Sequence, residues 1–267
     1  NGMVVGYGLA VLIGVVLGSL GGGGAVLTVP VLLYGFGVGM KAAVPMSLAV
    51  VGTTSVYGVW RYHQRREVDF HSALVFGPAA MLGALGGTWA ALRVSSRLQL
   101  VVFAVLLLTT AVMMLRGRKK AAVPGGRRSP VLLGIIGAGV GFLTGLVGVG
   151  GGFMYVPALT LMARLEMRRA VGTSLALIVL SCAAGLAGYA GRYDLDWGLI
   201  GIFTALALVG VALGTTVSAR LPQATLRRAF AVLLLLMGAF VLARGEAQSV
   251  EHTMNTGIHD DAVSTLL

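Results

Sequence analysis

Two glycine clusters hold the backbone groups of this chain that are best suited to binding a ligand. Residues 18–30 read GSLGGGGAVLTVP and residues 145–157 read GLVGVGGGFMYVP, so each cluster is followed by a proline. A helix that starts after such a cluster, at Ala25 or Phe153, presents free N–H groups and the positive end of its dipole to the glycines. Glycine also lets a ligand approach closely. The spacing therefore predicts an anion site built from two facing helix N-termini, without a lysine or arginine.

Another use of the glycines stays open. Gly14 with Gly18, and Gly141 with Gly145, form G-x-x-x-G pairs, which allow membrane helices to pack closely. A nucleotide loop is not predicted, because GVGGGF lacks the third glycine of the dinucleotide fingerprint and no Walker lysine follows it.

Hydroxyl side chains form the second group of candidates. The segments KAAVPMSLAVVGTTSVYG at 41–58 and RRAVGTSLALIVLSCAAG at 168–185 carry several of them, and Ser47 and Ser174 are the strongest candidates for substrate contact. The same hydroxyls can instead bond their own helix backbone, as serine and threonine in membrane helices usually do. The further candidates are Thr53, Thr54, Ser55, Thr173 and Ser181.

The ionisable residues do not form a catalytic or metal-binding constellation. Asp69 and Asp196 precede apolar stretches, where N-capping and an ion pair to the arginine four residues earlier explain them. His63 and His71 have no further ligand close in sequence, so we expect no metal and no other cofactor. All nine acidic residues fall in predicted loops or tails. The sequence therefore predicts no enzyme, and we find no acidic coupling group within a span.

Composition places the chain in a membrane. Of its 267 residues 57% are hydrophobic and 11% are charged, and the mean hydropathy is +0.91, which lies outside the range of soluble domains. Residues 98–115 and 197–219 carry no charge over lengths that can cross a bilayer. The net charge of +11 lies in short loops, so it indicates orientation in the bilayer and no nucleic-acid partner. Cys182 is the only cysteine, which excludes an internal disulfide.

An internal repeat organises the sequence. Shifting it by 127 positions aligns Pro30 with Pro157, and Ser47-Leu48-Ala49 with Ser174-Leu175-Ala176. The matches include glycine, tyrosine, aspartate and arginine, so they are not an effect of hydrophobicity and identify a duplicated unit. The predicted segments are a first transmembrane repeat at 1–116, a basic cytoplasmic linker at 117–129, a second repeat at 130–245 and a polar tail at 246–267.

Each unit contains five apolar stretches, of which the second is short and contains a proline. We expect the first stretch of the chain to belong to the mature protein and not to a cleaved signal peptide. The stretches are roughly 3–20, 25–39, 43–60, 71–92 and 98–115, then 131–147, 152–163, 170–190, 197–219 and 225–243.

The relative direction of the units depends on the first two stretches of each. If these form a pair, the units are inverted, and if they act as one crossing, the units are parallel. With the linker in the cytoplasm, the inverted arrangement places 15 of the 20 lysines and arginines inside, and the parallel arrangement places 11 there. Because cytoplasmic loops are enriched in these residues, the sequence favours inverted units with both termini outside. Inverted repeats with matched broken helices are typical of secondary transporters.

Three segments of the second half resemble the TauE/SafE family of membrane transporters, also called the toluene-sulfonate uptake permease family or sulfite exporters. They read GFLTGLVGVGGGFMYVPAL, RRAVGTSLA and GYAGRYDLDW, and the resemblance extends over residues 5–245. The first half departs from the pattern, with Pro45-Met46 where the second half has Gly172-Thr173. The resemblance implies binding residues at the family motifs of the second half and at their repeat partners in the first. These are Gly148, Gly150, Gly151, Gly152, Pro157, Thr173 and Ser174, with Gly21, Gly23, Gly24, Pro30 and Ser47.

Together these observations predict an all-α polytopic membrane protein with two inverted-topology repeats and broken or re-entrant helices at the glycine clusters. The resemblance implies a multi-pass plasma-membrane protein that moves sulfite or sulfonates such as sulfoacetate. We expect export, because an anion leaving a cell that is negative inside gains about 2.3 kcal/mol per charge per 100 mV. An anion channel with the same site and a non-transporting scaffold are the alternatives, and a homo-oligomer stays open.

Overall fold

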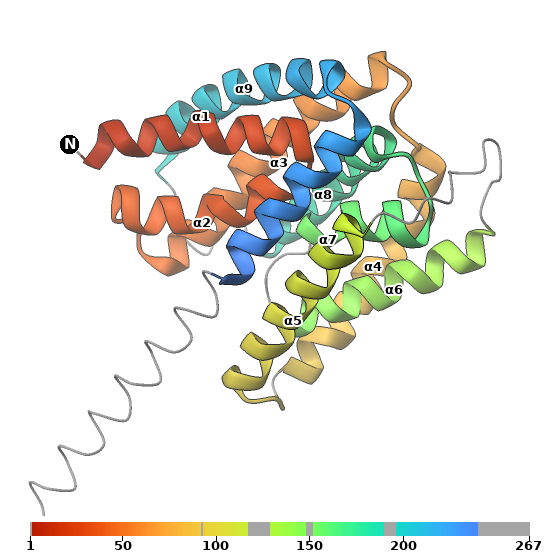
Figure 1. Cartoon of the computed structure of the whole chain (residues 1–267). Coiled ribbons are helices and arrows are strands. Elements are labelled where there is room, and N and C mark those ends of the chain that lie inside the picture. Colours follow the sequence, from red (N-terminus) through yellow and green to blue (C-terminus); the bar gives the residue numbers. More distant parts are fainter. Residues whose placement is uncertain (1, 92, 117–128, 148–151, 190–195, 240–267) are drawn as a thin grey trace, which may run out of the picture.

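The computed structural model describes residues 2–91, 93–116, 129–147, 152–189 and 196–239, and within these ranges it contains helices and no strand. Most of the predicted linker and the whole predicted tail lie outside the described residues. The elements, drawn in Figure 1, are α1 (Gly2–Leu20), α2 (Gly23–Phe36), α3 (Met40–Gln64), α4 (Phe70–Ala91), α5 (Ser96–Leu115), α6 (Pro130–Val147), α7 (Gly152–Pro157), a π-helix (Ala158–Met162), α8 (Met167–Tyr189), α9 (Trp197–Arg220) and a last helix at 223–239.

The helices follow the ten predicted apolar stretches. One stretch, 152–163, is divided between α7 and the π-helix, and each of the others corresponds to a single helix. A long apolar segment in lipid has no water to bond its backbone, and a helix satisfies those groups within the segment. The all-α prediction is therefore confirmed.

Two of the helices begin behind an aspartate. The Asp69 carboxylate accepts a hydrogen bond from the N–H of Ser72 at 3.1 Å, and that of Asp196 accepts one from the N–H of Leu199 at 2.9 Å. These contacts confirm the predicted N-caps of α4 and α9, each of which stabilises a helix by about 1 kcal/mol. The predicted ion pair between Arg65 and Asp69 is wrong, because the Arg65 guanidinium binds α9 instead.

Two helix pairs pack backbone to backbone along glycines. Gly14 of α1 lies against Ala207 of α9, and Gly141 of α6 lies against Ala80 of α4. A methyl group on either glycine would overlap the carbonyl oxygen of the facing helix. The helix-packing interpretation of the G-x-x-x-G pairs is confirmed, and each contact joins the first helix of one sequence unit to the fourth helix of the other.

The contacts also give the directions of these helices. Gly18 of α1 faces Val211 of α9, so the facing residue numbers rise together and the two helices run parallel, as do α6 and α4. Just before α4 begins, Arg65 donates to the carbonyl of Thr215 near the end of α9 at 2.7 Å. The start of α4 therefore lies beside the end of α9, and the two pairs run in opposite directions, which supports the inverted arrangement.

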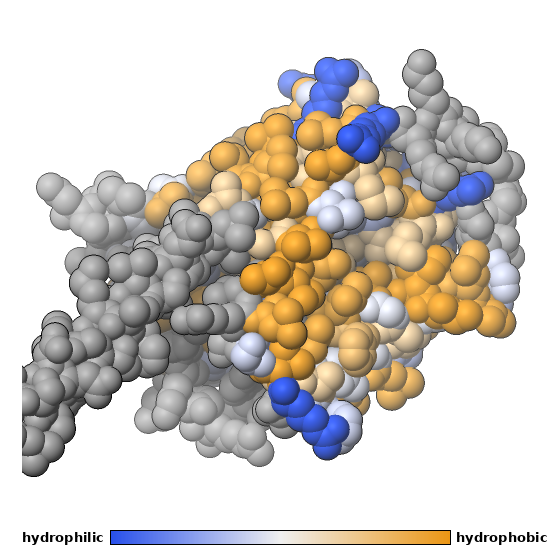
Figure 2. Space-filling view, turned by 60° about the horizontal axis from the view of Figure 1, so that its bottom comes forward, coloured by the Kyte–Doolittle hydropathy of each residue, from blue (hydrophilic) through white to orange (hydrophobic). Residues whose placement is uncertain are grey.

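The surface of the molecule is suited to lipid. Within the described residues, four helical segments are long and apolar enough to cross a membrane, namely Ala42–Gln64, Phe70–Ala91, Met167–Ala187 and Trp197–Arg220, and shorter apolar helices accompany them. Figure 2 shows a broad hydrophobic band on one face, with hydrophilic residues gathered at its two edges. Leu82 and Leu85 of α4 are each 71% exposed. Such a surface is stable in a bilayer and not in water, so this is a multi-pass membrane protein.

Candidate substrate-binding site

The first glycine cluster breaks the chain between α1 and α2. The N–H of Gly21 still donates to the carbonyl of Leu17, at 2.8 Å, but Gly21 has a φ of +75°, which L side chains rarely adopt. The chain reverses there and α2 begins at Gly23. The predicted start at Ala25 is wrong by two residues, because Gly23 and Gly24 are buried in the first turn of the helix and do not belong to the break.

Residues from both sequence units meet at this break. Gly22 lies directly against Gly152, since a methyl group on Gly22 would overlap the Gly152 carbonyl. Gly21 lies against α8, where the Oγ of Ser174 would be 2.5 Å from a methyl group on Gly21. All four of these residues are buried. The structure thus brings the α1–α2 break, the start of α7 and one hydroxyl of α8 together.

The start of α2 turns the N-terminal backbone of a helix toward the break. Gly22 caps this helix with no side-chain hydrogen bond, and the first N–H groups of a helix have no acceptor within that helix. A helix also carries roughly half a positive elementary charge at this end. Buried N–H groups in proteins almost always have a partner, so the break is a candidate for ligand binding.

The second cluster is described only in part. Three of its predicted binding residues lie outside the described residues, namely Gly148, Gly150 and Gly151. Gly152 begins α7, one residue before the predicted start at Phe153, and α7 passes after Pro157 into the π-helix. Proline removes one helical hydrogen bond, and π-turns of this kind occur often at functional sites. This short helix is therefore irregular, as its sequence predicts.

The two leading hydroxyls both bond their own helix. The Oγ of Ser174 donates to the carbonyl of Val171 at 2.8 Å, and that of Ser47 donates to the carbonyl of Val44 at 2.7 Å. This is the backbone bonding that the sequence left open as an alternative. Each oxygen keeps lone pairs but has used its proton. Of the two, Ser174 is the one that contacts the break through Gly21.

Three of the predicted binding residues connect or shape helices. Thr173 accepts a hydrogen bond from the N–H of Asp69 at 3.0 Å, which ties α8 to the loop before α4. Pro30 lies inside α2, and Pro157 is the last residue of α7. These positions shape the helices that carry the break.

Sequence reasoning missed three residues at the break. Gly22 is the N-cap of α2, and the side chains of Val156 and Val171 would lie 3.1 and 3.5 Å from a methyl group on Gly21. The unbroken run of four glycines was a signal for Gly22. The two valines gave none, because valine occurs throughout the apolar segments.

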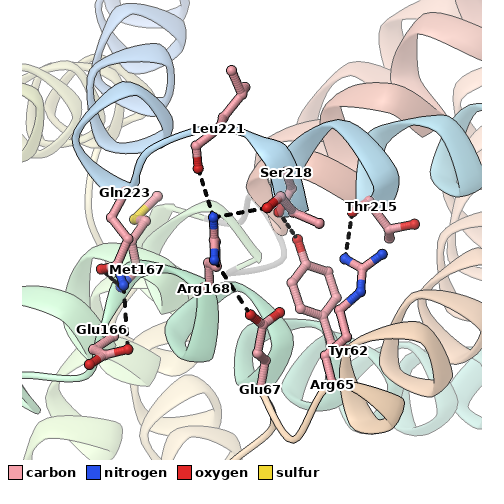
Figure 3. A network of polar contacts seen from close by, with 11 residues as sticks. Tyr62, Arg65, Glu67, Glu166, Met167, Arg168, Thr215, Ser218, Leu221 and Gln223 are labelled. Atoms are coloured by element: carbon pink, nitrogen blue, oxygen red, sulfur yellow. Dashed lines mark hydrogen bonds and ion pairs between the residues drawn. The ribbon is translucent and has the colours of Figure 1, made fainter.

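A polar network lies next to the break, at the ends of α3 and α9 (Figure 3). The hydroxyl of Tyr62 donates to the carbonyl of Gly18 at 2.9 Å and lies 2.7 Å from the Oγ of Ser218. Gly18 is in the last turn of α1, three residues before Gly21. The network therefore fixes the end of α1 to α3 and α9.

Arg168 extends the network to α8. Its Nη2 donates to the carbonyls of Ala219 and Leu221 at 3.0 and 2.9 Å, and its Nη1 lies 4.0 Å from a carboxylate oxygen of Glu67. A cation is favourable at a helix C-terminus, where the last carbonyls have no helical partner. Arg168 and Arg65 thus both hold the end of α9.

The histidines have no metal-binding surroundings in the described residues. No group of three or more His, Cys, Asp or Glu side chains there is close enough to hold a metal ion. The ring of His63 packs edge-on against Phe70, with 5.3 Å between the ring centroids. Its surroundings are those of a packing residue.

Comparison with known proteins gives one family and several relatives. Residues 7–241 match the family described as sulfite exporter TauE/SafE. A probable membrane transporter protein of Xylella fastidiosa is 30% identical, with 93% of this chain and 98% of that protein covered. Probable membrane transporter proteins of Methanocaldococcus jannaschii and Bacillus subtilis are 27% and 26% identical, with 88% and 86% of this chain and 94% and 96% of those proteins covered. No solved structure matches the chain.

Proposed function

This chain belongs to the sulfite exporter TauE/SafE family of membrane transporters, and we propose that it carries small sulfur-containing anions, sulfite or sulfonates such as sulfoacetate, out of the cell. Membership in a transporter family supports a small-molecule substrate and a lipid environment in place of an enzymatic reaction.

The observation that carries the proposal is the buried break at Gly21 and Gly22. It combines the N-terminus of α2, whose first N–H groups have no acceptor within the helix, with the hydroxyl of Ser174. Sulfite and the sulfonate group each present three oxygens around one sulfur, which suits several N–H donors held close together. The Gly152 carbonyl fills the space beside Gly22 in this structure, so we propose that the anion docks at the break when the start of α7 moves away from it.

We propose further that the sequence units 1–116 and 130–245 are inverted and move against each other around this break. The opposite directions of the α1–α9 and α4–α6 pairs support this arrangement, because such pairs exchange roles when access alternates between the two sides. Outward movement of the anion is favoured by about 2.3 kcal/mol per charge per 100 mV in a cell that is negative inside.

Counterflow in proteoliposomes tests the proposal. Vesicles loaded with unlabelled sulfite or sulfoacetate should accumulate the labelled anion from outside, sulfate should compete weakly, and an imposed negative interior should accelerate efflux. A channel would give conductance without counterflow, and a scaffold would give no flux. Either of these results would replace the proposed transporter.

Ser174→Ala tests the position of the anion. We propose that the Ser174 hydroxyl turns its proton from the carbonyl of Val171 to the anion when the anion docks. Loss of this donor should raise the half-saturating concentration of the anion about two- to tenfold, the equivalent of roughly 0.5–1.5 kcal/mol. Thr53→Ala is the matched control, because Thr53 is exposed on α3 and likewise bonds its own backbone, at Ala49. An unchanged half-saturating concentration in Ser174→Ala would assign Ser174 to packing alone.

A further inference from the structure

The loop between α3 and α4 holds a carboxylate that the anion site does not use. The backbone of Glu67 is fixed, because its N–H donates to the carbonyl of Tyr62 at 3.0 Å and its own carbonyl lies directly against Gly172 of α8. Two residues later the N–H of Asp69 bonds Thr173. The loop is therefore held on the first two turns of α8.

The charge of Glu67 is incompletely paired. Its Oε1 lies 4.0 Å from Arg168 Nη1, which is the outer limit of an ion pair, and its Oε2 is buried without a partner in the described part of the chain. The Nε of Arg168 is also buried with no described partner. A buried polar atom left without a hydrogen bond costs about 1–3 kcal/mol. The ion pair of Glu67 and Arg168 therefore leaves one buried polar atom on each side chain without a described hydrogen bond.

Several charges surround this carboxylate. Burial is the largest influence and raises the pKa of Glu67, and Glu166 raises it further, while three arginines lower it. α9 faces the pair with backbone carbonyls, which do not titrate. The ionisable groups that face Glu67 are Tyr62 and Arg65 at the end of α3, and Glu166, Arg168 and Arg169 at the start of α8.

The pair is connected to the break through two helices. Arg168 precedes Ser174 by six residues on α8, which is about 9 Å along a helix. The same network reaches Gly18 of α1 through the hydroxyl of Tyr62, and Figure 3 shows Tyr62 and Arg168 beside Glu67. The structure thus ties the pair to both sides of the break, α8 and the end of α1.

We propose that Arg168 is a second binding position for the transported oxyanion, at the entrance to the break. The carboxylate of Glu67 competes with the oxyanion for the guanidinium of Arg168 until Glu67 takes up a proton. The inference rests on the proposed anion transport. Protonation of the Oε2 or Oε1 of Glu67 removes the negative charge beside Arg168 and leaves the guanidinium for the substrate. The proton stays on Glu67 and is not carried across the membrane.

The experiment measures labelled sulfoacetate counterflow at a series of pH values from about 5 to about 8, equal on both sides of the vesicle, where the charges of sulfoacetate change little. In the unaltered protein the half-saturating concentration should be at least about threefold higher at the upper end of this series. Glu67→Gln should give the low value throughout, and Arg168→Gln a high value throughout. Glu166→Gln removes only a smaller influence that raises the pKa of Glu67, so it should keep most of the pH dependence.

Two outcomes separate this inference from the proposed function. Absence of counterflow in the unaltered protein contradicts the proposed function, whereas equal pH dependence in the unaltered protein and Glu67→Gln overturns the inference alone. Infrared titration of the purified protein in detergent adds a measurement that needs no transport. A carboxyl group that deprotonates above the usual range of glutamate should be present in the unaltered protein and missing in Glu67→Gln, and its presence in both overturns the inference.

Discussion

Glycines in this protein meet two different requirements, which are space for a neighbouring backbone and a positive φ. Gly22 has an ordinary helical φ of −54° but no room for a side chain, because the Gly152 carbonyl occupies the space. Gly37, at the end of α2, has a φ of +68° and open space around it. Gly139 in α6 has neither constraint. What the break requires at Gly22 is therefore the absence of a side chain and not a special backbone conformation.

Alanine at these three positions separates the two requirements. Gly22→Ala should lower the thermal midpoint in detergent most and abolish counterflow, because two backbones would have to move apart. Gly37→Ala should cost about 1–2 kcal/mol through backbone strain alone. Gly139→Ala should be neutral or stabilising by up to about 1 kcal/mol, since alanine is the better helix former. A Gly22→Ala protein as stable and active as Gly139→Ala would contradict the close approach of the two clusters.

The raised pKa of Glu67 predicts a pH dependence of stability. A carboxyl whose pKa is higher in the folded than in the unfolded state contributes stability below its unfolded pKa of about 4.3, and this contribution is lost as the pH rises through the folded pKa. The thermal midpoint of the unaltered protein relative to Glu67→Gln should therefore fall as the pH is raised from about 4 to about 8. Glu166→Gln removes only a smaller influence that raises this pKa, so the same comparison with Glu166→Gln should show a smaller change. A difference between the unaltered protein and Glu67→Gln that rises with pH would mean that the pairing with Arg168 outweighs burial.

The helices themselves were predictable, but their starts at the glycine clusters were not. Long uncharged segments between loops of arginine and aspartate fix where helices lie, and the caps at Asp69 and Asp196 follow from residue type. Glycine is a poor helix former, so the sequence predicts a break through Gly23 and Gly24. Burial of these residues and their packing in the fold override that preference.

The backbone contact between α4 and α6 can be tested at two glycines of α4. Gly83 lies so close to Ala138 that a methyl group would overlap its carbonyl, whereas Gly86 is exposed one turn away with only the ring of Phe142 at 3.7 Å. Gly83→Ile should therefore reduce the yield of monodisperse protein in size-exclusion chromatography severalfold or more. Gly86→Ile should leave it nearly unchanged, and similar yields from both variants would contradict backbone contact between the helices.

At the scale of the whole molecule, the sequence could predict a duplication but not how its units are joined. The contacts of α1 with α9 and of α6 with α4 link residues more than a hundred positions apart or across the linker, and no local pattern encodes them. The same holds for Glu67, which the sequence places in a loop and the structure buries beside Arg168. Long-range packing decides which polar residues are taken out of water, and composition alone does not.

Chemical labelling tests the inverted arrangement of the two units. Arg164 is exposed between the π-helix and α8, and Ser95 is exposed at the start of α5. The inverted arrangement places Arg164 in the cytoplasm and the parallel arrangement places it outside, while Ser95 is outside in both. Replacing the buried Cys182 by alanine first removes the chain's only cysteine.

In this cysteine-free protein, Arg164→Cys should react with a membrane-impermeant maleimide only after the cells are permeabilised, and Ser95→Cys should react in intact cells. The reason is the free-energy cost of moving several arginines through the bilayer, which keeps an arginine-rich loop on the cytoplasmic side, where it is synthesised. Labelling of Arg164→Cys in intact cells, with Ser95→Cys labelled equally, would establish the parallel arrangement. The two units would then not exchange access by inversion, and the break between α1 and α2 would need another way to open to each side.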